Sequence, residues 1–263
     1  LAPLIAAHAA TAPAIGAPGR DWLTYGALRD LSGEVGAALH GQGIGRGDRV
    51  AIVLPNGPEM ATAFVTIAQT ATAAPLNPAY RQEEYEFYLE DLKAKALVVA
   101  AEYDGPALPA AARFGIRVLR LTASARDPAG TFTLSTETAG DRCDTTAPEA
   151  DDTALILHTS GTTSRPKIVP LLHANVAASA QNIGASLGLK SDDRCLNVMP
   201  LFHIHGLVAA VSASLAAGAS IWCSPGFNAL SFFSWMKEAR PTWYTAVPPM
   251  HQAILSRAGR NAE

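Results

Sequence analysis

The feature that most limits the fold is the alternation of short apolar runs with longer amphipathic segments. RVAIVLP at 49–55 and ALVVA at 96–100 have the composition of short buried strands. Between them Met60, Phe64 and Ile67 recur at helical spacing. Strands separated by helices form parallel sheets with right-handed crossovers, so the sequence predicts an α/β fold.

The same alternation continues on both sides of these elements. A helix is predicted over 23–43, with Thr24 as its N-cap and Gly41 at its end, and another over 79–95. Further predicted strands are TALILH, IVPLL, CLNVMP, SIWC and TWYTAVP, with one helix after IVPLL and one beginning at His205. Residues 122–152 are small and polar, so we expect two α/β lobes, 1–150 and 151–263.

Composition and charge exclude several classes of protein. With 49% hydrophobic and 16% charged residues among 263, the chain is globular rather than disordered or fibrous. A net charge of −3 provides no basic field for nucleic acid. No apolar run approaches the roughly 20 residues of a membrane span. Residues 1–14 lack the positive segment of a signal peptide and do not begin with methionine, and we expect them to be the ragged edge of a longer protein.

The cysteines point to a reducing compartment. Cys143, Cys195 and Cys223 are odd in number and far apart, which supports neither a disulfide framework nor a metal knuckle. We expect Cys195 and Cys223, in apolar strands, to be core thiols. The sequence therefore favours a cytoplasmic protein.

The segment HTSGTTSRPK at 158–167 has the chemistry of a phosphate-binding loop. Its small residues leave backbone N–H groups accessible, and its hydroxyls can donate to phosphate oxygens. Lys167 adds a positive point charge. It is not a Walker A loop, because Pro166 and Ile168 flank the lysine. Taken alone, such a cluster is also compatible with a surface turn that binds nothing.

Three polar or proline-bearing segments follow predicted strands: TSGTTSRPK, LFHIH at 201–205 and PMHQ at 249–252. Ligands of open α/β sheets bind outside the carboxyl ends of the strands. We therefore expect the three segments to line one cleft, with His203 near Thr162.

Several motifs in register resemble the adenylate-forming superfamily, which includes acyl-CoA synthetases, coumarate-CoA ligases, luciferases and adenylation domains of peptide synthetases. The matching segments are LTYGAL at 23–28, GDRVAIVLPNGPE at 47–59, APLNPAYRQEE at 74–84, TSGTTSRPK at 159–167, MPLFHIHG at 199–206 and TWYTAVPPMHQAIL at 242–255. The resemblance covers nearly the whole chain, in the family's order.

The resemblance implies a two-step reaction. A carboxylate and ATP, with Mg²⁺, give an acyl adenylate and pyrophosphate, and coenzyme A then takes the acyl group. It assigns phosphate binding to Thr159, Ser160, Gly161, Thr162, Thr163 and Ser164. It also implies catalytic roles for Lys167 and His203 and contact with the magnesium ion for Thr162. No nucleic acid or membrane partner is implied.

His205 is the residue that bears most on which carboxylic acid would bind. As a metal ligand with His203 it lacks a third partner. The resemblance instead places it in the acyl pocket, where an N–H donor suits a small, polar or dianionic acid. Ser164 and Ile168 depart from the common glycines, and the combination is similar to the branch of short-acid ligases that includes oxalate-CoA ligase.

The resemblance also shows what lies outside these residues. The family's Mg²⁺-binding Glu, ribose-binding Asp, hinge and C-terminal-domain Lys belong downstream of Glu263, so we expect the small C-terminal domain to be missing and residues 1–263 alone to be inactive. Two alternatives stay open: a non-catalytic nucleotide-binding module, and a medium- or long-chain fatty acyl-CoA ligase.

Overall fold

The computed structural model describes residues 1–135, 143–159 and 166–259, and confirms the α/β fold. One seven-stranded sheet has the order β7-β6-β5-β3-β4-β8-β9. Its strands are β3 (Arg49–Val53), β4 (Thr72–Pro75), β5 (Ala96–Ala100), β6 (Arg117–Thr122), β7 (Thr133–Ser135), β8 (Thr153–Thr159) and β9 (Lys167–Leu172). The five inner strands are parallel, and β7 and β9 are antiparallel edges.

A five-stranded sheet has the order β12-β10-β11-β1-β2. Its strands are β1 (Pro13–Ala17), β2 (Arg20–Thr24), β10 (Arg194–Asn197), β11 (Ser220–Cys223) and β12 (Trp243–Thr245). All run parallel except β2, which forms a hairpin with β1. Each sheet combines strands from both sides of residue 150, so the lobes expected on either side of it are not the two sheets.

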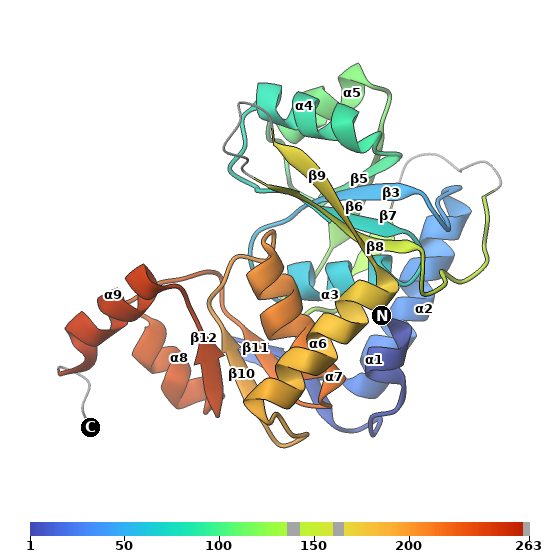
Figure 1. The fold of residues 1–263 in the computed structure, drawn as a ribbon. Helices are drawn as coiled ribbons and strands as arrows, with labels where there is room; N and C mark the ends of the chain where they lie inside the picture. Colours follow the sequence, from blue (N-terminus) through green and yellow to red (C-terminus); the bar gives the residue numbers. More distant parts are fainter. Residues whose placement is uncertain (136–142, 160–165, 260–263) are drawn as a thin grey trace.

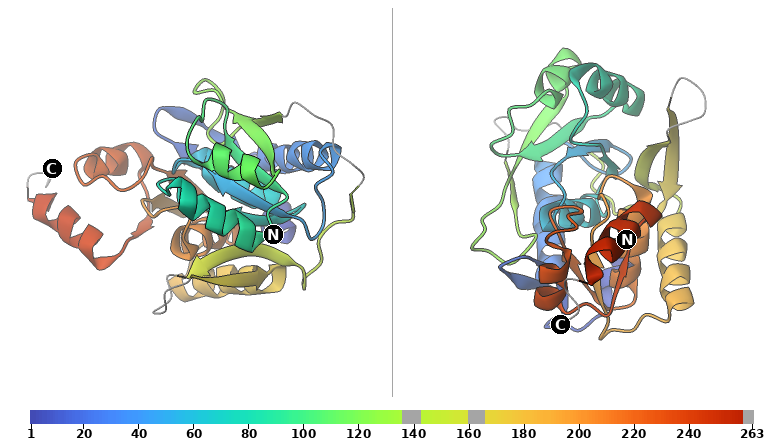
Figure 2. Two further views of the ribbon diagram at one scale, coloured as in Figure 1. Left: turned by 90° about the horizontal axis from the view of Figure 1, so that it is seen from above. Right: turned by 90° about the vertical axis from the view of Figure 1, so that its left-hand side faces the viewer.

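Helices separate and cover the two sheets (Figure 1). They are α1 (Ala2–Ala6), α2 (Tyr25–Gly41), α3 (Pro58–Ile67), α4 (Gln82–Leu92), α5 (Ala107–Arg113), α6 (His173–Leu187), the π-helix η1 (His205–Ser212), α7 (Ala213–Ala216), α8 (Phe232–Ala239) and α9 (Pro248–Ala258). Helix α3 contacts β3 and β4 of one sheet and β1 and β11 of the other. The views in Figure 2 show α4 and α5 on the face of the seven-stranded sheet opposite α3.

Alternating side chains of the central strands explain this layering. On β3, Val50 and Ile52 pack with α2 and α3, whereas Ala51 and Val53 pack with α4 and α5. All four are buried, as expected for a parallel strand covered on both faces. The apolar run 49–55 therefore became a central strand because both of its faces have a helix to pack against.

Local signals explain several helix ends. The Thr24 hydroxyl accepts the N–H of Ala27 at 3.2 Å, which caps α2. Helix α4 begins three residues later than predicted, where the Glu84 carboxylate accepts the Arg81 N–H at 2.8 Å. It ends before Lys93, which adopts a left-handed conformation with φ 48°.

Three features of the structure go beyond the sequence predictions. The first residues form α1 and β1, which the sequence did not predict, and Ile15 is paired with Ile221 and fully buried. The segment 122–152 contains the short edge strand β7. The helix from His205 begins as a π-helix, with the Ser212 hydroxyl donating to Leu207 O at 2.8 Å.

Candidate functional site

The predicted phosphate loop lies at the tip of the β8–β9 hairpin. Thr159 and Lys167 are the last cross-strand partners of the antiparallel pair, and both are exposed. The Thr159 hydroxyl donates to Lys167 O at 3.5 Å. The predicted phosphate ligands Ser160, Gly161, Thr162, Thr163 and Ser164 lie outside the described residues, as does the magnesium contact assigned to Thr162. The hairpin thus brings the two ends of the loop together.

The strand that leads into the loop is fastened to α4. His158 Nε2 lies 3.0 Å from Asp91 Oδ2, and its side chain is only 5% exposed. The ring of Tyr88 meets it edge-on at 4.6 Å between centroids. Burial lowers the pKa of His158, and Asp91 opposes that shift. Sequence reasoning placed Tyr88 inward correctly but missed His158 as an anchor.

His203 lies in the turn that follows β10. The His203 N–H donates to Pro200 O at 3.4 Å, and Leu207 N–H donates to His203 O at 3.1 Å. Gly206, at the start of η1, packs against this turn with no room for a side chain, because a Cβ there would lie 2.4 Å from Pro200 O. The His203 side chain is exposed, and partial burial lowers its pKa, which favours the neutral imidazole at neutral pH.

His205 is joined to the end of β12. Its Nε2 lies 2.7 Å from the Thr245 hydroxyl oxygen. Strands β10 and β12 are parallel neighbours with Asn197 opposite Thr245, so this contact sits at their carboxyl ends. The structure therefore places LFHIH, one of the three polar segments, against the end of the predicted strand TWYTAVP.

The third expected segment, PMHQ, begins α9. His251 Nδ1 lies 3.1 Å from the Tyr244 hydroxyl, which belongs to β12. PMHQ is thus tied to the same strand that holds His205. The expected closeness of His203 and Thr162 stays a prediction, because Thr162 is outside the described residues.

The carboxyl edges of the two sheets meet in the segment after β3. Asn56 accepts the Leu201 N–H at 2.8 Å and donates to Ser224 O at 3.1 Å, thereby contacting the segments after β10 and β11. One side chain that follows a strand of the seven-stranded sheet thus binds the segments that follow two strands of the five-stranded sheet. Sequence reasoning quoted this segment, PNGPE, without assigning it a role.

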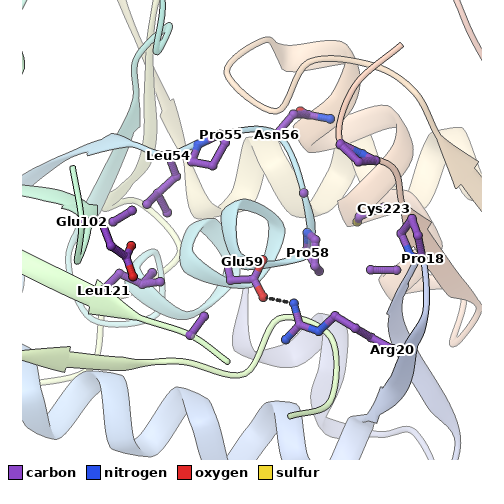
Figure 3. A pocket seen from close by; sticks show the side chains of 15 residues that line it. Pro18, Arg20, Leu54, Pro55, Asn56, Pro58, Glu59, Glu102, Leu121 and Cys223 are labelled. Atoms are coloured by element: carbon purple, nitrogen blue, oxygen red, sulfur yellow. Dashed lines mark hydrogen bonds and ion pairs between the residues drawn. The ribbon is translucent and has the colours of Figure 1, made fainter. Parts of the chain in front are cut away.

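Asn56 also lines a pocket of about 350 Å³ between the sheets (Figure 3). Its wall is mainly apolar, with Leu54, Pro58 and Cys223 among its residues. Arg20 forms an ion pair with Glu59 there and donates to three backbone carbonyls of the segment 124–128. The charges of Arg20 and Glu59 in this wall are therefore paired with each other.

The sequence also led to predictions about the cysteines, candidate metal ligands and possible membrane-spanning helices. Cys195 and Cys223 are free and fully buried, as expected of core thiols, and burial raises the pKa of both. Within the described ranges, no three His, Cys, Asp or Glu side chains gather as a metal site. None of the described helices has the length and apolarity needed to cross a membrane.

Comparison with known proteins agrees with this geometry. Residues 5–263 match the family model described as AMP-binding enzyme. The chain is 41% identical to oxalate–CoA ligase of Arabidopsis thaliana over 95% of its length and 50% of that protein. It is 33% identical to oxalate–CoA ligase of Saccharomyces cerevisiae over 87% of the chain and 48% of that protein.

The crystal structure of apo MatB from Rhodopseudomonas palustris has the same fold, with a TM-score of 0.82 at 27% identity, over 97% of this chain and 50% of that one. The ATP-bound form of MatB gives a TM-score of 0.81 at 26% identity. The chain thus spans about half the length of the relatives it matches. Over that half the resemblance seen in the motifs is confirmed, and the chain belongs to the family of AMP-binding enzymes.

Proposed function

We propose that this chain forms the ATP- and carboxylate-binding part of an acyl-CoA ligase that activates a small acid, with oxalate as the leading candidate. The observation that carries the proposal is the 41% identity to oxalate–CoA ligase over 95% of the chain. The polar His205–Thr245 contact supports it, because an imidazole held by a hydroxyl suits a second carboxylate better than an alkyl chain.

In the proposed first step, a carboxylate oxygen attacks the α-phosphorus of Mg–ATP. The new P–O bond forms as the bond to pyrophosphate breaks, giving the acyl adenylate. In the second step the sulfur of coenzyme A attacks the acyl carbon and AMP leaves. Such chemistry depends on positioning and charge stabilisation rather than on a covalent enzyme intermediate.

The proposal assigns a role to each candidate site residue. Lys167, exposed at the mouth of the hairpin, supplies positive charge to the phosphates, and Thr159 begins the phosphate loop. We assign the rest of the cradle to Ser160, Gly161, Thr162, Thr163 and Ser164, with Thr162 toward the magnesium ion of Mg–ATP. His203, neutral at neutral pH, faces the α-phosphate and the carboxylate without adding charge there.

The free cysteines support a reducing, cytoplasmic setting for this reaction. The activity belongs to the full-length natural protein that contains these residues. Residues 1–263 alone are proposed to bind part of ATP but to turn over poorly.

The test is carboxylate-dependent ATP–pyrophosphate exchange by the full-length natural protein with oxalate, malonate, acetate, octanoate and coumarate. We expect exchange with oxalate, followed by formation of the corresponding CoA thioester when coenzyme A is added. Exchange with octanoate alone would identify a fatty acyl ligase instead. ATP binding without exchange for any acid would leave a non-catalytic nucleotide-binding module.

A further inference from the structure

We infer that Asn56 is a positioning residue for His203. Its hydrogen bonds fix the position of the turn that carries His203 relative to the sheet that carries the predicted phosphate loop. The inference rests on the proposed function for its catalytic consequence, but its structural basis is independent. Asn56 follows β3 in the seven-stranded sheet, which also contains β8 and β9. His203 follows β10 in the five-stranded sheet.

The two hydrogen bonds of Asn56 need an amide. Oδ1 accepts the Leu201 N–H at 2.8 Å, while Nδ2 donates to Ser224 O at 3.1 Å. One partner is a donor and the other an acceptor, so the orientation of the amide is fixed by its neighbours. A carboxylate of the same shape would serve Leu201 and repel Ser224 O.

The bond to Leu201 anchors the turn close to the histidine. Leu201 is only 1% exposed and lies two residues before His203. The turn behind it is tight, because Pro200 O receives the His203 N–H and leaves no room for a side chain at Gly206. A shift of the Leu201 backbone therefore moves His203, because only one residue separates them and the turn that contains both is tightly packed.

The hydrogen bond from Asn56 to Ser224 O connects Asn56 to the ends of β11 and β10 as well. Ser224 donates to Asn197 O through its N–H at 3.2 Å and its hydroxyl at 2.8 Å. Asn197 in turn accepts the Met199 N–H at 3.2 Å. A continuous hydrogen-bonded network thus links the ends of β3, β10 and β11 at the base of the histidine turn.

The experiment uses the full-length natural protein with Asn56→Ala and the near-isosteric Asn56→Asp. Asn228→Ala is the matched control, since Asn228 also accepts backbone N–H groups, from Leu230 and Ser231, but is exposed and outside the network. We expect both Asn56 variants to lower kcat of exchange about 10- to 100-fold, as misplaced catalytic groups do, with the KM for ATP within about twofold. The control should stay within about twofold in both.

A second readout does not depend on turnover: the rate at which diethyl pyrocarbonate modifies His203, followed by peptide mass spectrometry. We expect this rate to change at least about threefold in Asn56→Asp and to match the natural protein in Asn228→Ala. Unchanged kcat together with an unchanged modification rate would overturn the inference, as would a rise in the KM for ATP with kcat preserved. If the natural protein exchanges with no acid, the proposed function fails, and the modification rate alone decides the placement of His203.

Discussion

The interior of the sheets and their carboxyl edges are held together by different means. Inside, β3 contributes Val50 and Ile52 to one core and Ala51 and Val53 to another, all buried and apolar. At the edges, single polar side chains join segments that are distant in sequence, such as Asn56 with Leu201.

The difference separates stability from function. Packing of many apolar groups supplies most of the free energy of folding, whereas each edge contact is one or two hydrogen bonds with a modest net contribution. Changes at the edge should therefore alter the reaction while the fold persists, and changes inside should do the reverse.

The largest expected effect is on the interior. Phe64 on α3 is fully buried between the sheets, so Phe64→Ala should lower the free energy of unfolding by about 3–5 kcal/mol. Chemical denaturation measures it, with Phe114→Ala as control because Phe114 is 36% exposed. Equal losses in the two variants would contradict the assignment of α3 as the central packing helix.

The next largest effect is expected from a substitution at Lys167, near the tip of the β8–β9 hairpin. Lys167→Ala should reduce kcat/KM for ATP–pyrophosphate exchange about 10²–10³-fold, as loss of one charge-stabilising donor does. Its melting temperature should stay unchanged, because Lys167 is exposed. The exposed Lys190 provides the control, Lys190→Ala. Full activity in Lys167→Ala would remove this residue from the phosphate site.

A smaller effect is expected at His205, the residue proposed to bind the acid. Thr245→Val removes the hydroxyl that lies 2.7 Å from His205 Nε2. We expect kcat/KM for oxalate to fall about 3- to 10-fold, while any activity with octanoate is unaffected. Kinetics with both acids measure this, and an equal fall for both would show that the contact only supports the fold.

The smallest effect concerns pH. The pKa of His158 is below its ordinary value of 6.5 in the fold, so the unfolded chain binds more protons as pH falls through 6.5. Stability should therefore decline from neutral pH toward acid. Asp91→Asn removes the group that opposes the shift and should steepen that decline by about one to two degrees in Tm between pH 7 and 5. A shallower decline would give the pair the opposite role.

The sequence predicted the interior well, because its signals are local. The periodicity of α2 and its Thr24 cap, the apolar runs of β3 and β5, and the inward Tyr88 depend only on neighbouring residues. The β1–β11 pairing was missed because it joins residues about 200 positions apart, and nothing near Ile15 identifies its partner.

The candidate site was predicted through motifs rather than geometry. His203, His205 and Lys167 stood out through their chemistry and their resemblance to a family. Asn56 did not, because an asparagine after a strand resembles any turn residue until its partners are known. A hydrogen bond between two sheets becomes visible only once both sheets are placed.

The central claim is that ATP and the acid bind where the carboxyl edges of the two sheets meet. Hydrogen–deuterium exchange of the full-length natural protein, with and without Mg–ATP and oxalate, tests it most directly. We expect new protection in peptides spanning 159–167 and 198–206, with the core peptides of α2 and β5 unchanged. Protection confined to the core peptides of α2 and β5, with none at 159–167 or 198–206, would contradict it.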